Sequence, residues 1–342
     1  MSSRSDAVLI VKLGALGDIM IATAAIRAIQ RAEHGKIIWL FTTPAFAPIF
    51  AHWPGLQVKS YPRKDVLGVA QALWWIRRRR FQRVYDLQGN DRSRTLCALS
   101  GIPERIGNAR RFPYTRYPVE ASFEHPYHRL NALLAAAGIN RMEPCPWLPL
   151  SDRQSGRIDQ WLNTQHLTQG GFALLHAGGS ARWQTKRWPY FAELAAALQE
   201  RDCSVVWIGA GDDAVLNREL AVRGGIDATD GFSICELAEL GRRARFAITN
   251  DSGPMHVLAC SGIPVYSFFG PTNWRRSHAL GQAGRVLTLH VECSPCHLPI
   301  CPPGYGHACL RGLEVGKVLA RLRSDGLIEG LADYRDSSTS RA

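Results

Sequence analysis

Residues 248–256 read ITNDSGPMH, and this stretch decides the fold. The apolar residues 246–248 are typical of a buried strand, and residues 255–260 predict a helix. A strand that ends in a polar turn before a helix leaves backbone N–H groups at the helix start, under a partial positive charge. Phosphate groups bind at such positions. Asp251 and Ser252 would hold a phosphate or a sugar hydroxyl there, or they would serve only as helix caps.

Length and composition favour a two-domain protein. A chain of 342 residues exceeds one ordinary core, and its 46% apolar residues are enough to fill two. No stretch approaches the roughly 18 to 20 uninterrupted apolar residues of a membrane span. The first six residues lead into a strand without the apolar segment of a signal peptide. We therefore expect a cytoplasmic protein.

The positive charge is concentrated in the first half of the chain. Residues 1–150 hold 21 Lys and Arg against 10 Asp and Glu, which gives +11 of the total of +12. Arginines 77–80 end a predicted helix and partly complement its dipole, but the arginines further along need another explanation. The asymmetry predicts an anionic partner for the first half: nucleic acid, a phospholipid surface or a phosphorylated glycan.

The first half follows the pattern of a doubly wound α/β fold. Residues 7–13 form an apolar run typical of a central parallel strand. A turn at 14–18 and a helix around 19–29 follow, which is the first unit of such a fold. The turn lacks the spacing G-x-G-x-x-G of a dinucleotide site. Further strands are expected at 36–43, 83–87 and near 105–107, helices at 66–80, 91–99 and 128–137, and a binding loop at 110–127.

A proline-rich stretch at 140–152 is the best linker in the sequence. After it the alternation restarts, with strands expected at 172–176, 204–208, 246–249 and 264–269 and helices near 188–200, 213–222, 234–243 and 254–261. We expect domains at 1–147 and 148–330 and a polar tail at 331–342. Two such halves predict two Rossmann-like domains with a cleft between them, where ligands bind at the carboxyl ends of the strands.

Three loops of the second half follow predicted strands and are expected to converge on one nucleotide-like ligand. Gly178, Gly179 and Ser180 allow the backbone to approach a ligand closely. Lys186 then places a positive charge near the same expected ligand site. Asp212 fits a contact to ribose hydroxyls or a helix cap, and the cap is the preferred interpretation. The third loop is the one that contains Asp251.

In the first half, Asp18 lies at the start of a helix directly after a glycine turn. Its simplest role is a favourable interaction between a carboxylate and the helix dipole. Its catalytic role would be that of a general base that takes a proton from an acceptor hydroxyl. Both roles stay open on the residues alone.

Three motifs together resemble glycosyltransferase family 9, the ADP-heptose:lipopolysaccharide heptosyltransferases of Gram-negative bacteria. They are KLGALGD at 12–18, HAG at 176–178 with K-x-W-P at 186–189, and NDSGPMH at 250–256. The resemblance covers about residues 7–323. It implies the GT-B fold, with two facing Rossmann-like domains and a central cleft, and an inverting transfer without an essential metal or cofactor. The acceptor would bind to the first domain and the sugar nucleotide to the second.

Residue by residue, the resemblance makes Asp18 the general base and Lys186 the contact to the phosphates, where it stabilises the leaving ADP. Gly178, Gly179 and Ser180 would line the phosphate loop. The donor's diphosphate and sugar would be held by Asp251, Ser252, Gly253 and His256. Two features depart from the pattern of the heptosyltransferase I type, namely Ala15 in place of a hydroxyl residue and a longer loop at 176–186.

The resemblance also implies the partners. They are an ADP-heptose donor and the phosphorylated lipid A–Kdo or heptose core as acceptor, with peripheral contact at the inner face of the inner membrane and no nucleic acid. A GT-B enzyme that uses another nucleotide sugar is the main alternative. A non-enzymatic protein that binds anionic glycans or polymers would leave the three loops unexplained. A nicotinamide-dependent oxidoreductase is disfavoured by the missing glycine fingerprint.

Four of the nine cysteines are clustered at Cys293, Cys296, Cys301 and Cys309. In a cytosolic chain this spacing favours a metal over disulfides, but the second C-x-x-C of a zinc ribbon is missing. A cysteine-rich surface loop without a metal is the alternative. Members of the heptosyltransferase II type look similar in this region, which favours that type or a later core transferase.

Overall fold

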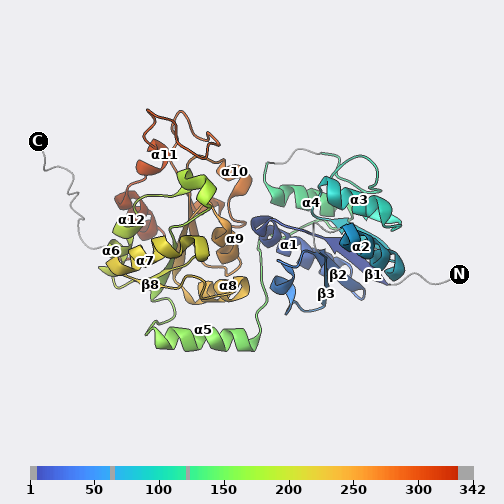
Figure 1. Ribbon diagram of the computed structural model, residues 1–342, viewed down its shortest axis with the longest axis horizontal. Coiled ribbons are helices and arrows are strands. Elements are labelled where there is room, and N and C mark those ends of the chain that lie inside the picture. The colour runs from blue at the N-terminus through green and yellow to red at the C-terminus, as the bar shows by residue number, and fades with distance from the viewer. Residues whose placement is uncertain (1–5, 62–65, 121–123, 330–342) are drawn as a thin grey trace, which may run out of the picture. The chain divides into compact units, whose positions relative to one another are not determined.

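A computed structural model describes residues 6–61, 66–120 and 124–329 of the chain (Figure 1). The predicted polar tail at 331–342 lies outside the described residues. The chain divides into two compact units. Unit 1 comprises residues 1–155, 259–261 and 275–281, and unit 2 comprises residues 156–258, 262–274 and 282–342. The division therefore falls inside helix α5 (Asp152–Thr164), and two short segments of the second half belong to unit 1.

Unit 1 is built on a five-stranded parallel sheet with the order β3-β2-β1-β4-β5. Its strands are β1 (Ala7–Val11), β2 (Ile37–Thr42), β3 (Leu56–Ser60), β4 (Arg83–Asp86) and β5 (Glu104–Ile106). Its helices are α1 (Leu16–Ala32), η1 (Ala47–Phe50), α2 (Val66–Arg79), α3 (Asp91–Leu99) and α4 (Pro126–Ala136).

The alternation of side chains along β1 divides the core of unit 1 between the two faces of the sheet. All five residues of β1 are buried. Ala7, Leu9 and Val11 belong to one cluster with the α2 residues Trp75 and Ile76. Because alternate residues of a strand point to opposite faces, this cluster places α2 on one face of the sheet. A central strand buried on both faces is what the apolar run at 7–13 predicted.

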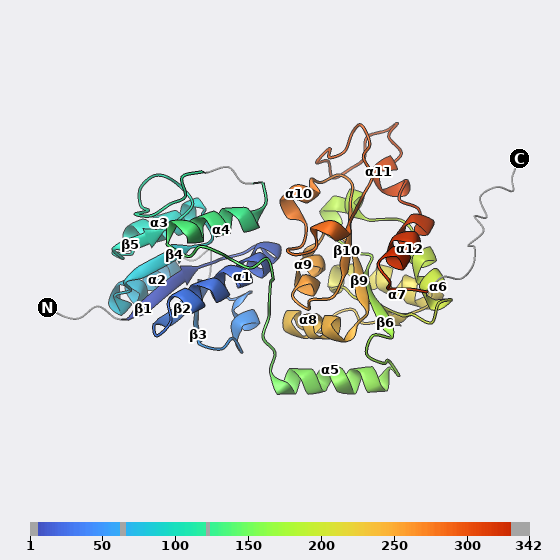
Figure 2. The same cartoon turned by 180° about the vertical axis from the view of Figure 1, so that it is seen from behind.

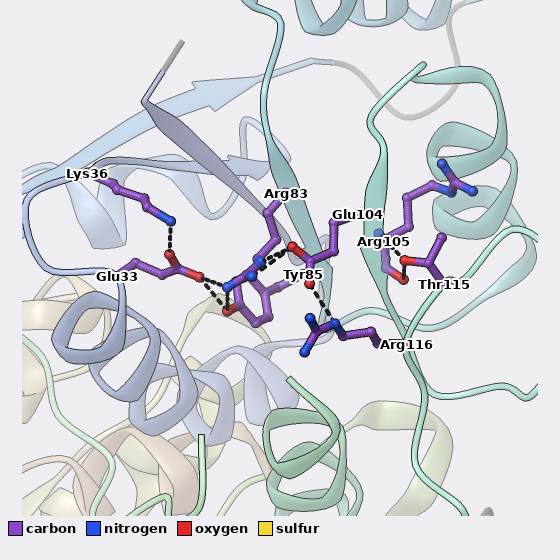
Figure 3. Close-up of polar contacts among 8 residues, drawn as sticks. All are labelled: Glu33, Lys36, Arg83, Tyr85, Glu104, Arg105, Thr115 and Arg116. Carbon is purple, nitrogen blue, oxygen red and sulfur yellow. Dashed lines mark hydrogen bonds and ion pairs between the residues drawn. The ribbon is translucent and has the colours of Figure 1, made fainter. Parts of the chain in front are cut away.

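A network of charged residues lies at the edge of the sheet of unit 1 where β4 and β5 begin (Figure 3). Arg83 and Glu104 are register partners at the first positions of these strands, and Nε of Arg83 donates to Glu104 over 2.7 Å. Arg83 also pairs with the buried Glu33, which accepts from the Tyr85 hydroxyl at 2.7 Å and pairs with Lys36 at 2.7 Å. The network lies at the strand starts, whereas ligands of such sheets bind at the strand ends. Its role is therefore structural.

Unit 2 is built on a six-stranded parallel sheet with the order β11-β10-β9-β6-β7-β8. Its strands are β6 (Phe172–His176), β7 (Ser204–Trp207), β8 (Ile226–Asp227), β9 (Phe246–Asn250), β10 (Val265–Phe269) and β11 (Val286–Thr288). Its longer helices are α6 (Phe191–Gln199), α7 (Ala214–Arg223), α8 (Ile234–Arg243), α9 (Gly253–Ala259) and α12 (Val315–Ser324). Its short helical turns are η2 (Ala181–Lys186), η3 (Gly211–Asp213), η4 (Ala283–Arg285) and α11 (Ala308–Arg311). The short helix α10 (Trp274–Ser277) begins in unit 2, but its residues from 275 onward belong to unit 1.

Trp188 anchors the core of unit 2 directly after the loop that follows β6. Its ring stacks on Phe268 of β10 with centroids 4.2 Å apart, and its Nε1 donates to the carbonyl of Leu313 over 2.7 Å. A buried indole N–H usually has such a partner, because leaving it without one costs free energy. Because Trp188 is fixed, Lys186, two residues before it, is held near the strand ends.

The two parallel sheets confirm the predicted α/β class, and the expected strands and helices are present with small shifts at their ends. Several elements were not predicted: β3, β8, β11, α5 and α12. Of the residues of α5, only Ile158 and Leu162 are buried, so its sequence gives a weak apolar signal. In the described part of the chain, no helix is long and apolar enough to cross a membrane.

Candidate active site

Asn250, the last residue of β9, fixes the loop that follows the neighbouring strand β6. Its side chain is fully buried, and its Nδ2 donates to the carbonyls of Ala177 and Gly178, each over 2.8 Å. Its Oδ1 accepts from the backbone N–H of Trp188 at 3.0 Å. One amide thus satisfies three buried backbone groups and ties both ends of the loop from Ala177 to Trp188 to β9.

A buried histidine joins this loop to those after β7 and β9. His176 places Nε2 at 3.3 Å from Asp213 Oδ2 and Nδ1 at 3.1 Å from the Ser252 hydroxyl. Asp213 also accepts from the backbone N–H groups of Gly179 and Ala210, at 3.2 and 3.3 Å. Burial raises the pKa of Asp213, but the hydrogen bonds from His176 and these N–H groups outweigh it and hold the pKa below its usual range. These contacts bring the three predicted loops together within unit 2. The nucleotide-like ligand on which they would converge remains a prediction.

Asp213, and not its neighbour Asp212, is the carboxylate at the centre of this arrangement. Asp212 is exposed in η3, whereas Asp213 is buried. A Cβ atom on Gly178 would collide with the Asp213 carboxylate, and a Cβ on Gly209 would lie 2.8 Å from Asp213 Cβ. Both positions thus need glycine because the two loops approach this carboxylate closely. The predicted contact of Asp212 with ribose remains a prediction.

Lys186 and Asp251 form an ion pair between the loops after β6 and β9. Lys186 Nζ lies 2.8 Å from Asp251 Oδ2, which also accepts from the Thr272 hydroxyl at 2.7 Å. The Asp251 side chain is 8% exposed and that of Lys186 is 21% exposed. The Lys186 ammonium also lies 5.3 Å from the centre of the Trp183 ring. Lys186 is therefore held in place while part of its charge remains accessible to an anion.

The other predicted donor contacts follow the same two strands, β6 and β9. Gly179 has a φ of 155°, and Ser180 after it is exposed. Gly253 begins helix α9, and His256 is half-buried on the same helix. All eight predicted donor residues and Lys186 belong to unit 2, whereas Asp18 belongs to unit 1.

In unit 1, Asp18 lies in the first turn of α1, and its side chain is 37% exposed. Lys12, which follows β1 and is almost completely buried, places Nζ 3.8 Å from Asp18 Oδ2. Burial lowers the pKa of Lys12 to about 8, although the carboxylates of Asp18 and Asp86 act in the opposite direction. Asp18 therefore has a cationic neighbour on its buried side and is open to solvent on the other.

Asp86, the last residue of β4, organises the loop next to Asp18. It is fully buried and accepts from the backbone N–H of Gly89 at 2.9 Å, that of Gln88 at 3.1 Å and the Tyr114 hydroxyl at 2.5 Å. Burial raises its pKa, and these hydrogen bonds offset the effect only in part. Gln88 in turn accepts from the N–H of Leu13 at 2.8 Å, which joins this loop to the one after β1.

The two joined loops border a hollow of about 410 Å³ into which Asp18 opens. Its lining residues are Leu13, Gly14, Ala15, Asp18, Gln88, Asn90, Asp91 and Arg92. An exposed carboxylate, an arginine and amide side chains fit a ligand that carries hydroxyl and acidic groups. Gln88 and Arg92 were not predicted as site residues. A polar residue that ends an apolar strand before a glycine, as in VYDLQG at 84–89, was the signal that could have found this loop.

The cysteine cluster is present as a group of thiols. Cys309 is buried, and burial together with the nearby Cys293, Cys296 and Cys301 raises its pKa to about 11. No set of three or more His, Cys, Asp or Glu side chains is arranged to hold a metal ion in the ranges that the structure describes.

Two parallel α/β units, with an open carboxylate in one and a lysine-bearing polar loop set in the other, are the arrangement expected of a glycosyltransferase of the GT-B type. The sequence pattern of glycosyltransferase family 9 (heptosyltransferase) matches residues 70–302. The chain belongs to this family. The resemblance, the fold class and the enzyme class predicted from the motifs are thereby confirmed.

The relatives agree with this assignment. The chain is 27% identical over 325 residues to lipopolysaccharide heptosyltransferase 1 of Pseudomonas aeruginosa, which covers 86% of the chain and 87% of the relative. A family 9 glycosyltransferase from Veillonella parvula has a similar structure, with a TM-score of 0.78, 19% identity and coverage of 95% and 98%. The Escherichia coli heptosyltransferase WaaC, solved with ADP-2-deoxy-2-fluoro heptose, matches with a TM-score of 0.68, 19% identity and coverage of 93% and 99%.

Proposed function

We propose that this glycosyltransferase moves a heptose from ADP-heptose to the inner core of lipopolysaccharide, with inversion at the anomeric carbon. The ion pair between Lys186 and Asp251 carries the proposal, because it fixes a cation at the strand ends of unit 2 where a diphosphate would bind. The family assignment and a relative named for lipopolysaccharide heptose transfer support the choice of substrates.

Unit 2 is the donor-binding part of the proposal. The Lys186 ammonium has two N–H groups beyond the one directed at Asp251, and these would bind the diphosphate. Gly178, Gly179 and Ser180 would line the phosphate loop. The nucleotide and the sugar would be held by Asp212, Asp251, Ser252, Gly253 and His256. The buried network around His176 and Asn250 holds these loops in position before the donor binds.

Unit 1 is the acceptor-binding part, and Asp18 is the general base. The acceptor oxygen attacks the anomeric carbon from the face opposite the diphosphate, while Asp18 takes the proton of that hydroxyl. The bond from the anomeric carbon to the phosphate oxygen breaks, and ADP leaves with the electron pair. Lys186 stabilises the charge that develops on the diphosphate. The chemistry requires the donor held by unit 2 to meet Asp18 of unit 1.

The acceptor is the phosphorylated lipid A–Kdo or heptose core. The net charge of +11 on residues 1–150 fits an acidic glycolipid, and the arginine-lined hollow beside Asp18 fits its sugar acids. A lipid acceptor places the protein at the cytoplasmic face of the inner membrane as a peripheral protein. Domain limits of 1–147 and 148–330 are part of the same proposal.

Turnover with defined substrates tests the proposal. The chain is incubated with ADP-heptose and with lipid A–Kdo that either lacks or carries the first heptose, which also separates the I and II types. Asp18→Asn is expected to lower kcat by about 100-fold or more and to leave the thermal shift caused by ADP unchanged. Unimpaired turnover in Asp18→Asn would show that Asp18 is not the general base. Transfer from other nucleotide sugars but not from ADP-heptose would exclude ADP-heptose as the donor.

Comparison of Lys186→Ala with a control variant distinguishes a lost contact to the donor from the general effect of removing one positive charge. Lys186→Ala is expected to weaken the thermal shift caused by ADP and to lower kcat/KM for ADP-heptose by about tenfold or more, since a charge-assisted contact is lost. Lys317→Ala removes an equal charge from an exposed position of α12 and serves as the matched control. Equal behaviour of the two variants would refute the phosphate contact.

A further inference from the structure

The outer side of helix α2 exposes large apolar side chains next to arginines. Ala72, Trp75 and Ile76 face the core, whereas Trp74 is 62% exposed and Val69 is 47% exposed. Arg77 and Arg78 follow on the same exposed side, and the Arg78 guanidinium lies 5.4 Å from the centre of the Trp74 ring. A tryptophan this exposed contributes little to the core that Ala72, Trp75 and Ile76 help to form, and together with its exposed apolar and cationic neighbours it points to an interaction surface.

Helix α3 extends this surface. It lies beside α2 in both views of the fold (Figures 1 and 2), and Nε of Arg77 donates to the carbonyl of Leu99 at its end over 2.9 Å. Leu99 itself is 45% exposed. We call the surface formed by Val69, Trp74, Arg77, Arg78 and Leu99 the α2–α3 face. It combines apolar and cationic side chains in one patch.

A hollow of about 690 Å³ opens between the two helices of this face. Val69, Ala72 and Leu73 of α2 line one wall, and Leu96 and Leu99 of α3 line the other. The hollow shares Leu13, Asp91 and Arg92 with the smaller hollow into which Asp18 opens. A molecule with an apolar part at the face and a sugar part inside would therefore reach the Asp18 carboxylate.

We propose that the α2–α3 face docks on a bilayer that contains anionic phospholipid. Tryptophan prefers the boundary between head groups and acyl chains, where its ring is apolar and its N–H is polar. Arginines beside it bind the lipid phosphates and are attracted by the negative surface potential. Val69 and Leu99 add exposed apolar surface to the same face. The inference rests on the proposed function in one respect, because a glycolipid acceptor is presented from such a bilayer.

Other occupants fit the face less well. A second copy of the chain in a symmetric dimer would bring the Arg77 and Arg78 pairs of both copies together, and like charges at an interface are unfavourable. Nucleic acid would satisfy the arginines but would gain nothing from exposed Val69 and Leu99. Both occupants are distinguished from a bilayer by the experiment.

Vesicle binding of the full chain tests the docking. The chain is sedimented with vesicles of phosphatidylcholine and with vesicles that also contain phosphatidylglycerol. The double variant Trp74→Ser/Arg78→Gln is compared with Val222→Ser/Arg223→Gln, which makes the same kinds of change on the exposed side of α7. Equal melting temperatures of all three proteins ensure that folding is unaffected.

We expect the unaltered chain and the α7 variant to bind the anionic vesicles, more weakly at higher salt, and the α2 variant to bind about tenfold or more weakly. The proposal is overturned if the α2 variant binds as well as the unaltered chain or if phosphatidylglycerol has no effect. A dimer that the α2 variant converts to a monomer would assign the face to a second copy and would also overturn it.

Turnover separates this inference from the proposed function. With a water-soluble acceptor that lacks acyl chains, the α2 variant is expected to keep the unaltered kcat/KM, and with the same acceptor in anionic vesicles it is expected to lose about tenfold. A loss with both acceptors would assign the face to sugar binding and would overturn the docking. Absence of turnover in the unaltered chain would reject the proposed function, and the vesicle assay would still decide on the face.

Discussion

Replacement of Asn250 by Asp exchanges one NH2 group for an oxygen on a buried side chain that makes three hydrogen bonds in the site. Asn250 donates two hydrogen bonds of 2.8 Å to the carbonyls of Ala177 and Gly178 and accepts one of 3.0 Å from Trp188. A carboxylate of the same shape keeps the accepted bond but loses both donated ones, and it places negative charge against two carbonyl oxygens. Each lost hydrogen bond costs about 1 to 1.5 kcal/mol, so Asn250→Asp is expected to destabilise unit 2 by about 3 kcal/mol.

Thermal unfolding measures this effect. For a unit of this size, about 3 kcal/mol corresponds to a decrease in Tm of roughly 6 to 12 °C. The loop from Ala177 to Trp188 carries Lys186, so KM for the donor is also expected to rise. Asn163→Asp makes the same chemical change at an exposed position of α5 and is expected to leave Tm and KM unchanged. If Asn250→Asp melts like the control, the amide does not hold the loop and the reasoning is wrong.

Two further predictions concern burial and close approach. Burial raises the pKa of Glu33, but its hydrogen bonds with Lys36, Tyr85 and Arg83 prevail and hold the pKa below its ordinary value of 4.5. The stabilisation by its carboxylate is therefore complete above pH 4.5 and is lost as the pH falls through the lowered pKa. Glu33→Gln is expected to lower the unfolding free energy by about 2 to 3 kcal/mol at neutral pH. Urea titrations should show that this difference from the unaltered chain shrinks below pH 4.5. The control Glu143→Gln, which removes the carboxylate of an exposed ion pair, should not change the unfolding free energy. Gly178→Ala forces a methyl group against the Asp213 carboxylate, so KM for the donor should rise and Tm should fall; Gly316→Ala, where the added Cβ meets nothing within 4 Å in α12, is the control, and equal results for the two would contradict the close approach.

The architecture was largely predictable because its signals are local. Continuous apolar runs such as 7–13 and 246–249 are typical of central parallel strands, and polar residues directly after them lie at one edge of each sheet. The candidate residues Asp18, Lys186 and Asp251 were found in this way. Strands β3, β8 and β11 were missed because their sequences are short or mixed, and such elements form only where a neighbouring strand or helix supports them.

The sequence by itself determined the fold class, the family motifs and the loops that carry the site. Tertiary structure decided which side chains in those loops meet: Asp213 instead of Asp212 at the centre, and Asn250 as the support of a loop 73 positions earlier in the chain. It also left Trp74 exposed while Trp75 is buried. The physical reason is that hydrogen-bond partners and burial depend on how strands distant in sequence pair within a sheet, and no local pattern contains that information.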